Sequence, residues 1–205
     1  MPPRKTTGAS RGTREAGSLQ RYHQKRDFKE TPEPRGARAK GSAKQLRFVI
    51  QKHHATRLHY DFRLEADGVL ASWAIPKGPA LDPKERRLAM HVEDHPMDYR
   101  TFEGIIPKGN YGAGEVIVWD EGTYELAEGD DPAKEIAKGK IKFILHGKKM
   151  KGEFTLVRIK GRTSESGDPW LLIKDKDEYV DPKYDIEKDD KSVKTGRALK
   201  SYEED

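Results

Sequence analysis

The chain has 205 residues, no cysteine, and 40 Lys and Arg against 35 Asp and Glu, which is enough length for one domain with a substantial core. Without cysteine it has no disulfide scaffold, no thiolate nucleophile and no Cys-ligated metal centre, so any metal ion has to be held by His, Asp, Glu or water. No apolar run approaches the roughly 20 residues that span a bilayer, and no apolar stretch follows the basic N-terminus as in a signal peptide, so we expect a cytoplasmic protein without membrane contact.

The charge is concentrated at the N-terminus. Residues 1–44 carry 12 basic and 4 acidic side chains, residues 45–175 carry 21 of each, and residues 176–205 carry 7 basic and 10 acidic ones. Such an arm buries too little apolar surface to fold alone, so we expect residues 1–20 to be a disordered tail. A solubilising tail and a contact with nucleic acid explain the charge equally well. The last residues, 176–205, are charged and poorly periodic, which predicts an extended or frayed tail.

Between the two tails, the pattern of side chains predicts many short strands. Arg57–Glu65 alternates strictly, with apolar side chains such as Phe62 on one face and polar ones such as Asp61 on the other, as in a half-buried strand. Pro132–Lys138 predicts a short helix with Asp131 as its N-cap. Strands of this spacing favour a β-barrel or a β-sandwich. The other predicted strands are Leu46–Gln51, Val69–Ile75, Arg87–Glu93, Glu115–Trp119, Thr123–Leu126, Lys140–Leu145, Glu153–Lys160 and Trp170–Lys174.

Three of the seven histidines fall within residues 53–59. In an extended strand His59 and Asp61 project from the same face, and His53 can join them from the segment before the strand, across an intervening turn. Two imidazoles and one carboxylate suit a divalent ion such as Mn²⁺, Fe²⁺, Co²⁺ or Zn²⁺, with coordination positions left open for water and substrate. His54 could compete with His53, but alternation places His54 on the opposite face.

Arg63 lies one step further along the same strand face. A guanidinium beside a divalent cation repels it unless an anion lies between them. A phosphate is the natural anion, because the planar fork of arginine matches its oxygens. The pattern therefore favours a phosphoester substrate, with an ion pair from Arg63 to Glu65 or Asp61 as the structural alternative.

A second polar cluster, Glu93–Tyr99, follows a predicted strand and is interrupted by Pro96. His95 could protonate a leaving oxygen or donate a hydrogen bond to a phosphoryl oxygen. Tyr99 could donate its hydroxyl to the same group. The alternative is a turn with a capping histidine and a packed tyrosine.

Two runs of the chain, FVIQKHHATRLHYDFRLEADGVLASWAIPKGP and RLAMHVEDHPMDYRTFEGIIPKGNYGAGEVIVWDEGTYE, closely resemble the 3′-phosphoesterase domain of LigD-type bacterial end-joining DNA ligases and its stand-alone versions. The upstream RDFKETPEP is similar to the family's N-terminal motif. The resemblance implies a mainly β protein, a compact closed or nearly closed β-barrel with one or two short helices, an extended basic N-terminal arm and a groove on its surface. We expect this domain at residues 21–175, followed by the charged tail.

The resemblance also implies an activity, a cofactor and a partner. The family heals 3′ ends with Mn²⁺: it removes a 3′-terminal ribonucleoside from a primer strand and then the remaining 3′-phosphate, leaving a 3′-OH. The implied partner is primer–template DNA with such an end, and Co²⁺ or Zn²⁺ could replace Mn²⁺. We expect a self-contained monomer without a polymerase or ligase domain, on whose tails a separate ligase or end-binding protein could dock.

The residues that match the family's motifs take over the roles that the resemblance implies. The implied roles are metal ligation by His53, His59 and Asp61, contact with the scissile phosphate by Arg63, His95, Tyr99 and Arg26, support of the site by Asp27 and Glu33, and secondary substrate contacts by Gln51 and Lys77. Glu33 would orient a ligand histidine, and residues 26–33 should then fold onto the barrel. His54 and Lys108 depart from the family pattern, because both stand where an acidic residue is common.

Two other functions are alternatives to this 3′-end-healing activity. A non-catalytic DNA-end-binding module would keep the barrel without turnover, but the intact set of polar side chains argues against it. A metal-dependent hydrolase of small phosphoesters is disfavoured by the basic arm, because a small substrate needs no extended basic surface.

Overall fold

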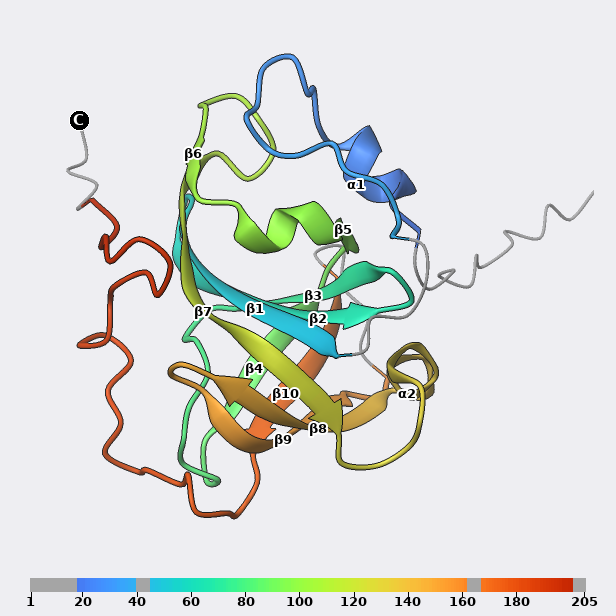
Figure 1. The fold of residues 1–205 in the computed structure, drawn as a ribbon, viewed down its shortest axis with the longest axis vertical. Helices are drawn as coiled ribbons and strands as arrows, with labels where there is room; N and C mark the ends of the chain where they lie inside the picture. The colour runs from blue at the N-terminus through green and yellow to red at the C-terminus, as the bar shows by residue number, and fades with distance from the viewer. Residues whose placement is uncertain (1–17, 40–44, 162–166, 201–205) are drawn as a thin grey trace, which may run out of the picture.

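A computed structural model describes residues 18–39, 45–161 and 167–200 of the chain. Eight of its strands form a closed antiparallel ring, which begins at β1 (Leu46–His54) and closes where β7 (Gly114–Leu126) pairs back with it (Figure 1). The ring continues from β1 through β2 (Leu58–Ala66), β3 (Val69–Ile75), β4 (Arg86–His91), β10 (Asp168–Lys174), β9 (Lys151–Arg158) and β8 (Lys140–Gly147) to β7. The prediction of a mainly β, closed barrel is confirmed.

The remaining elements are short. Two strands outside the ring, β5 (His95–Pro96) and β6 (Gly104–Ile106), pair with β3 and β7. The helices are α1 (Gln20–Gln24), the 3-10 helix η1 (Met97–Thr101) and α2 (Pro132–Lys138). None of the helices in the described ranges is long and apolar enough to cross a bilayer.

The sequence predicts the helix α2 correctly, but it predicts β7 incorrectly as two separate strands. Asp131 caps α2 as predicted, because its side chain accepts hydrogen bonds from the backbone N–H groups of Ala133 and Lys134. The two strands predicted at Glu115–Trp119 and Thr123–Leu126 are instead one strand. It continues through the glycine between them because residues on both sides of that glycine pair with β1.

The barrel interior holds the main core. Its largest fully buried side chains are aromatic, and the rings of Phe62 and Phe143 pack with their centroids 5.7 Å apart. Each fully buried large apolar side chain contributes roughly 1.5–3 kcal/mol to folding. This interior leaves the outward-facing side chains of the same strands free to build a site.

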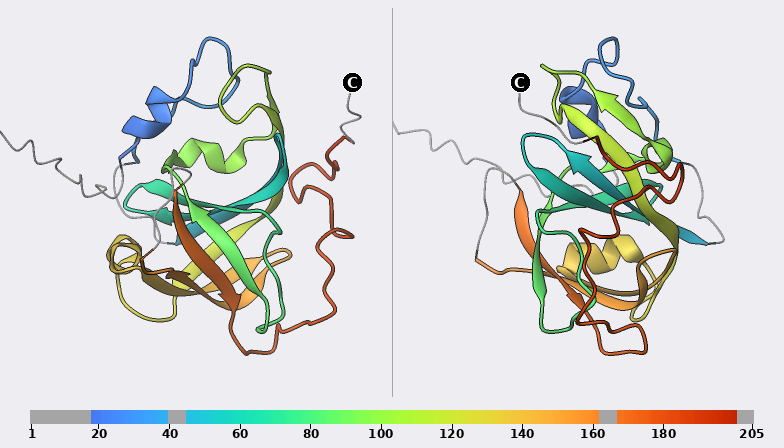
Figure 2. Two further views of the ribbon diagram at one scale, coloured as in Figure 1. Left: turned by 180° about the vertical axis from the view of Figure 1, so that it is seen from behind. Right: turned by 90° about the vertical axis from the view of Figure 1, so that its left-hand side faces the viewer.

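The outer face of β2 is buried as well. Asp61 and Arg63 are 7% and 2% exposed, so the expectation of a half-buried strand is wrong. The cover comes from the N-terminal arm and η1, which lie over β1, β2 and β3 (Figures 1 and 2). A second apolar cluster, separate from the main core, lies under this cover. Tyr22 of α1 is fully buried in it, so the arm folds onto the barrel. Residues 1–17 of the expected disordered tail lie outside the described residues.

The C-terminal strap, residues 175–200, runs as an extended segment along the barrel (red in Figures 1 and 2). Tyr184 and Ile186 pack against the main core. The N–H of Val193 donates to the carbonyl of Val118 at 3.0 Å. The segment is therefore extended, as expected, but it is held against the barrel at several points; residues 201–205 lie outside the described residues.

Candidate metal and phosphate site

The three predicted metal ligands meet on the outer face of the β1–β2 hairpin. His53 of β1 is the direct cross-strand partner of His59 in β2, and Asp61 lies two residues further along the same face. His53 Nδ1 is 3.4 Å from Asp61 Oδ2, and His59 Nε2 is 3.6 Å from Asp61 Oδ1. The three ligand atoms all lie within 4.8 Å of one another. His53 reaches the site across the turn between the two strands, as expected, and its pairing with His59 holds it there.

The outer hydrogen bonds of both histidines fit a metal ion between them. His53 Nε2 donates to the carbonyl of Gly112 at 2.9 Å, and His59 Nδ1 donates to the carbonyl of Arg57 at 3.0 Å. Because a carbonyl oxygen only accepts, these nitrogens carry ring hydrogens, and the second nitrogen of each ring faces Asp61. A metal ion bound between those nitrogens and the carboxylate would take the place of the ring protons that otherwise donate to Asp61. The residues form a possible metal-binding triad.

The charges of the triad favour the same conclusion. Burial by itself raises the pKa of Asp61, but the neighbouring Arg63 and hydrogen bonds from both histidines hold it well below its usual range. The carboxylate is therefore ionised and available as a ligand. His54 pairs with Leu58 on the opposite face and is not part of the triad.

Arg63 is positioned beside the triad, and one of its two terminal nitrogens is unused within the described residues. Its Nη2 lies 3.3 Å from Asp61 Oδ2, and its Nε donates to Gln51 Oε1 at 2.8 Å. Gln51 is fixed in turn, because its Nε2 donates to the carbonyls of Tyr99 and Phe102, each at 3.0 Å. Arg63 Nη1 is buried without a hydrogen-bond partner in the part of the chain that the structure describes. A buried guanidinium N–H of this kind is satisfied by an oxyanion.

The arm contributes the other cation of the site. Arg26 Nη2 lies 3.3 Å from His95 Nε2, and Arg26 Nε donates to Glu33 Oε1 at 2.9 Å. The Tyr99 hydroxyl donates to the same Glu33 oxygen at 2.8 Å, and the Arg63 guanidinium lies 4.9 Å from the Tyr99 ring centroid. Glu33 thus connects Arg26 with Tyr99. It does not orient a ligand histidine as the resemblance implied, since backbone carbonyls do that.

His95 is neutral in this arrangement. Burial and the positive charges of Arg63 and Arg26 place its pKa well below the ordinary value. His95 Nδ1 donates to the carbonyl of Glu93 at 3.0 Å, so the lone pair is on Nε2, where Arg26 donates to it. The residue is an acceptor here, and it holds no proton for a leaving oxygen.

Two of the predicted site residues lie apart from this cluster. Asp27 is exposed, and its Oδ1 accepts from the N–H of Lys29 at 3.0 Å, so it organises a turn of the arm. Lys77 is exposed in the turn after β3 and lines a separate depression with Arg86 and Arg87. The proposed substrate contact of Lys77 stays a prediction.

The structure also adds residues that the side-chain pattern did not assign. Glu93 accepts from Lys25 at 3.0 Å and from Arg26 at 3.4 Å, so it holds two cations of the arm. Its position in the polar cluster Glu93–Tyr99 could have indicated this role from the sequence. The carbonyl of Gly112 left no signal, since a backbone oxygen is the same at every position.

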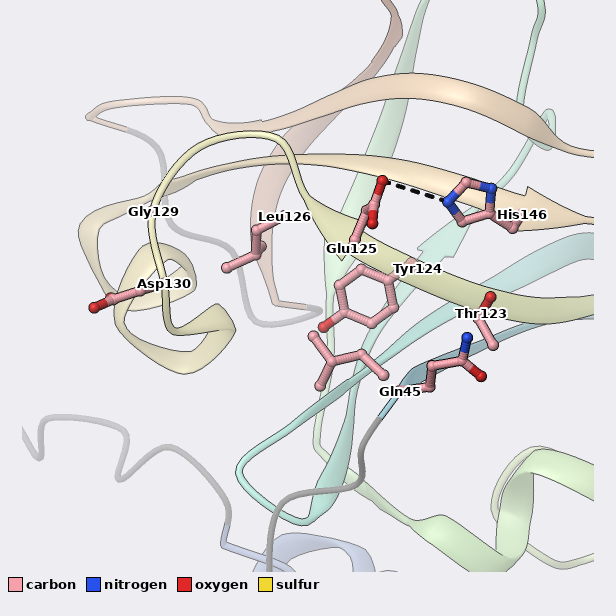
Figure 3. A pocket seen from close by; sticks show the side chains of 9 residues that line it. Gln45, Thr123, Tyr124, Glu125, Leu126, Gly129, Asp130 and His146 are labelled. Atoms are coloured by element: carbon pink, nitrogen blue, oxygen red, sulfur yellow. Dashed lines mark ion pairs between the residues drawn. The ribbon is translucent and has the colours of Figure 1, made fainter.

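Another pocket lies at the far end of the β7–β8 pair, close to α2 (Figure 3). At one edge of it, His146 Nε2 lies 3.6 Å from Glu125 Oε1. This pocket contains none of the predicted site residues. The candidate site is therefore the group of polar side chains around the β1–β2 hairpin.

The class of protein that carries this barrel and this site can be identified by comparison. A family model described as the DNA Ligase D 3′-phosphoesterase domain matches residues 51–158, a range that holds the triad, Arg63, His95 and Tyr99. The chain belongs to this family.

Curated relatives agree with the family. The chain is 54% identical over 160 residues to the multifunctional non-homologous end joining protein LigD of Pseudomonas aeruginosa, covering 78% of this chain and 19% of that protein. It is 46% identical over 169 residues to the multifunctional non-homologous end joining DNA repair protein LigD of Mycobacterium tuberculosis, covering 80% and 21%. The chain therefore spans about a fifth of the length of these relatives.

Proposed function

We propose that this chain is a metal-dependent phosphoesterase that removes 3′-terminal ribonucleosides and 3′-phosphates from primer strands and leaves 3′-OH ends for repair. The family and the names of the relatives support a role at DNA ends. One observation carries the proposal: beside two imidazoles and a carboxylate that fit a cation, the buried Arg63 has an N–H without a partner in the described ranges. A cation site next to an unsatisfied guanidinium suits a phosphate.

The chain's own residues supply most of the chemistry. Arg63, fixed by Gln51, binds a phosphoryl oxygen through its free Nη1. Arg26 supplies a second positive charge on the His95 side. A divalent ion held by the triad would act as a Lewis acid on a phosphate oxygen.

The protonation of His95 changes when the phosphate binds. Burial first, and then the charges of Arg63 and Arg26, hold its pKa low. A bound phosphate offsets those charges, so the pKa rises. When the phosphate also draws Arg26 away from Nε2, His95 can take up a proton there and pass it to the leaving oxygen, as a general acid.

Mn²⁺ is the ion that we propose, with Co²⁺ or Zn²⁺ as alternatives. The mixed nitrogen and oxygen ligands of His53, His59 and Asp61 suit all three ions. Titration of the metal-free protein with each ion, followed by the rate of 3′-phosphate release, ranks them. We also retain, as proposals, a cytoplasmic location, a monomer, and docking of a separate ligase or end-binding protein.

One experiment tests the activity. The protein is incubated with a primer–template that ends in a 3′-ribonucleotide, with and without Mn²⁺, and the products are resolved on a gel. We expect stepwise loss of the nucleoside and the phosphate only with metal. Asp61→Ala should abolish both steps, since losing a metal ligand costs several kcal/mol of barrier, or orders of magnitude in rate. Glu125→Ala, which removes a carboxylate from the other pocket, is the control. Near-normal activity of Asp61→Ala would refute the ligand assignment.

The rival functions predict different outcomes. A non-catalytic end-binding module binds the primer–template without metal-dependent turnover. A hydrolase of small phosphoesters responds little to ionic strength, whereas DNA binding weakens steeply as salt rises. We expect the steep dependence, because residues 1–44 carry 12 basic and 4 acidic side chains.

A further inference from the structure

The β6–β7 loop, residues 107–113, carries an exposed aromatic side chain at the edge of the site. Tyr111 is 47% exposed. It directly precedes Gly112, whose carbonyl holds His53 Nε2 at 2.9 Å. Tyr111 has no role in the proposed mechanism. Core packing does not explain it either, because about half of this large aromatic side chain is exposed to solvent.

The Tyr111 ring is nevertheless held in place by the arm. Lys25 Nζ donates to the Tyr111 hydroxyl at 3.1 Å and lies 4.3 Å from the ring centroid. The Arg26 guanidinium lies 5.4 Å from the same centroid. Lys25 is itself anchored by Glu93 at 3.0 Å. The ring therefore has a defined orientation even though much of its surface is open to solvent.

Tyr111 adjoins both halves of the site. Through Gly112 it is next to the metal triad, and through Arg26 it is next to His95, which Arg26 contacts at 3.3 Å. A phosphate bound at Arg63 in a nucleic acid carries a sugar and a base on at least one side. Among the tyrosines placed at the site, Tyr22 and Tyr99 are buried and Tyr111 is exposed, so the Tyr111 ring is the one that offers a surface to such a base.

Aromatic rings are the common platform for single-stranded bases, because every base has a π-face that stacks irrespective of sequence. We propose that Tyr111 stacks on the base of a nucleotide that flanks the scissile phosphate, and so binds the 3′ end of a polynucleotide rather than a small phosphoester. This proposal rests on the proposed function and names the part of the substrate that the loop recognises. Ordering of the ring by Lys25 lowers the entropy lost on stacking.

The test combines substitutions of Tyr111 with substrates that lack one base. Tyr111→Ala, Tyr111→Phe and wild type are assayed on three primer–templates: one complete, one with a base-free ribose at the 3′ terminus, and one with a base-free penultimate nucleotide. On the complete substrate Tyr111→Ala should lower kcat/KM by roughly 5- to 100-fold, mainly through KM, as for the loss of one base–aromatic stack. On one of the base-free substrates this penalty should disappear. Tyr111→Phe keeps the ring and should stay close to wild type.

A control and two further outcomes complete the design. Tyr179 is similarly exposed, at 43%, but lies in the C-terminal strap, so Tyr179→Ala should behave as wild type on all three substrates. If Tyr111→Ala is impaired equally on the complete and both base-free substrates, the proposal is overturned, because the residue then acts through the loop and not through a base. If wild type itself releases no product, the proposed function fails, and this proposal fails with it.

Discussion

At the scale of single residues, the charge state of His59 decides how the site responds to pH. Burial by itself lowers its pKa, but the hydrogen bond and charge of Asp61 outweigh burial and raise the pKa above its ordinary value of 6.5. Without metal, the ring is therefore protonated over a wider pH range than a free histidine. An imidazolium and a metal ion are alternative partners for the same carboxylate.

This competition predicts opposite effects of pH on stability and on metal affinity. The ion pair of His59 with Asp61 stabilises the metal-free fold fully below pH 6.5, and that contribution is lost as pH rises through the raised pKa. Metal needs the neutral ring, so its affinity should fall as pH drops through the same pKa. Urea unfolding of the metal-free protein and calorimetric titration with Mn²⁺, each across this pH range, measure both trends.

The variant His59→Gln supplies the comparison for the stability trend. It should be less dependent on pH over this interval than wild type, because glutamine does not titrate. A metal affinity of the wild-type protein that stays constant through the interval would contradict the placement of His59 in the triad.

The ligands could be predicted from sequence because they are local. His59 and Asp61 lie two residues apart on one strand face, and period-two alternation reports such a face. Alternation carries no information on what a distant segment contributes. The carbonyl that orients His53 comes from Gly112, 59 residues away, and Gln51 is fixed by carbonyls 48 and 51 residues away.

At the scale of elements, the junction between β1 and β7 supports the metal site. Gly114 begins β7 with a φ of +145°, and a Cβ there would lie 2.1 Å from the carbonyl oxygen of His54, the last residue of β1. Only glycine allows the two backbones to approach this closely. The same loop presents Gly112 to His53.

We therefore expect Gly114→Ala to damage the site through its support. Moving β7 away from β1 should cost roughly 1–3 kcal/mol of stability, as overpacking does, and should weaken Mn²⁺ binding as Gly112 shifts away from His53. Thermal unfolding and metal titration measure the two effects. Gly109→Ala is a matched control: Gly109 lies in the same loop at a φ of +91° with nothing within 4 Å of a Cβ, so it carries the backbone strain alone. Equal metal affinity of the two variants would refute the argument.

Element boundaries were predicted well where a local signal marks them and poorly where pairing decides. The Asp131 cap marks the start of α2 correctly. The length of β7 follows from its pairing with β1, which no short window contains. The alternation of β2 identified its two faces, but not that the arm would bury the polar one.

At the scale of the whole molecule, the C-terminal strap closes one side of the barrel. The indole N–H of Trp119, fully buried, donates to the carbonyl of Asp189. Lys149 Nζ pairs with the Asp189 carboxylate at 2.8 Å, and Tyr184 and Ile186 complete the main core. The strap is thus part of the folded unit, although its sequence is charged and poorly periodic. Its side chains are ordered by the barrel and by hydrogen bonds within the strap, such as that from the Tyr184 hydroxyl to Asp189 Oδ2 at 2.9 Å.

A chain that ends at Lys183 should test this dependence directly. It loses the packing of Tyr184 and Ile186 and the acceptor of the Trp119 indole, so we expect unfolding to become easier by roughly 2–5 kcal/mol. Tryptophan emission should shift to the red, because Trp119 gains contact with water. A chain that ends at Lys200 keeps the strap and should match wild type in urea midpoint and emission. If the shorter chain also matched wild type in both measurements, the strap would be a passive tail, and the barrel would be complete without it.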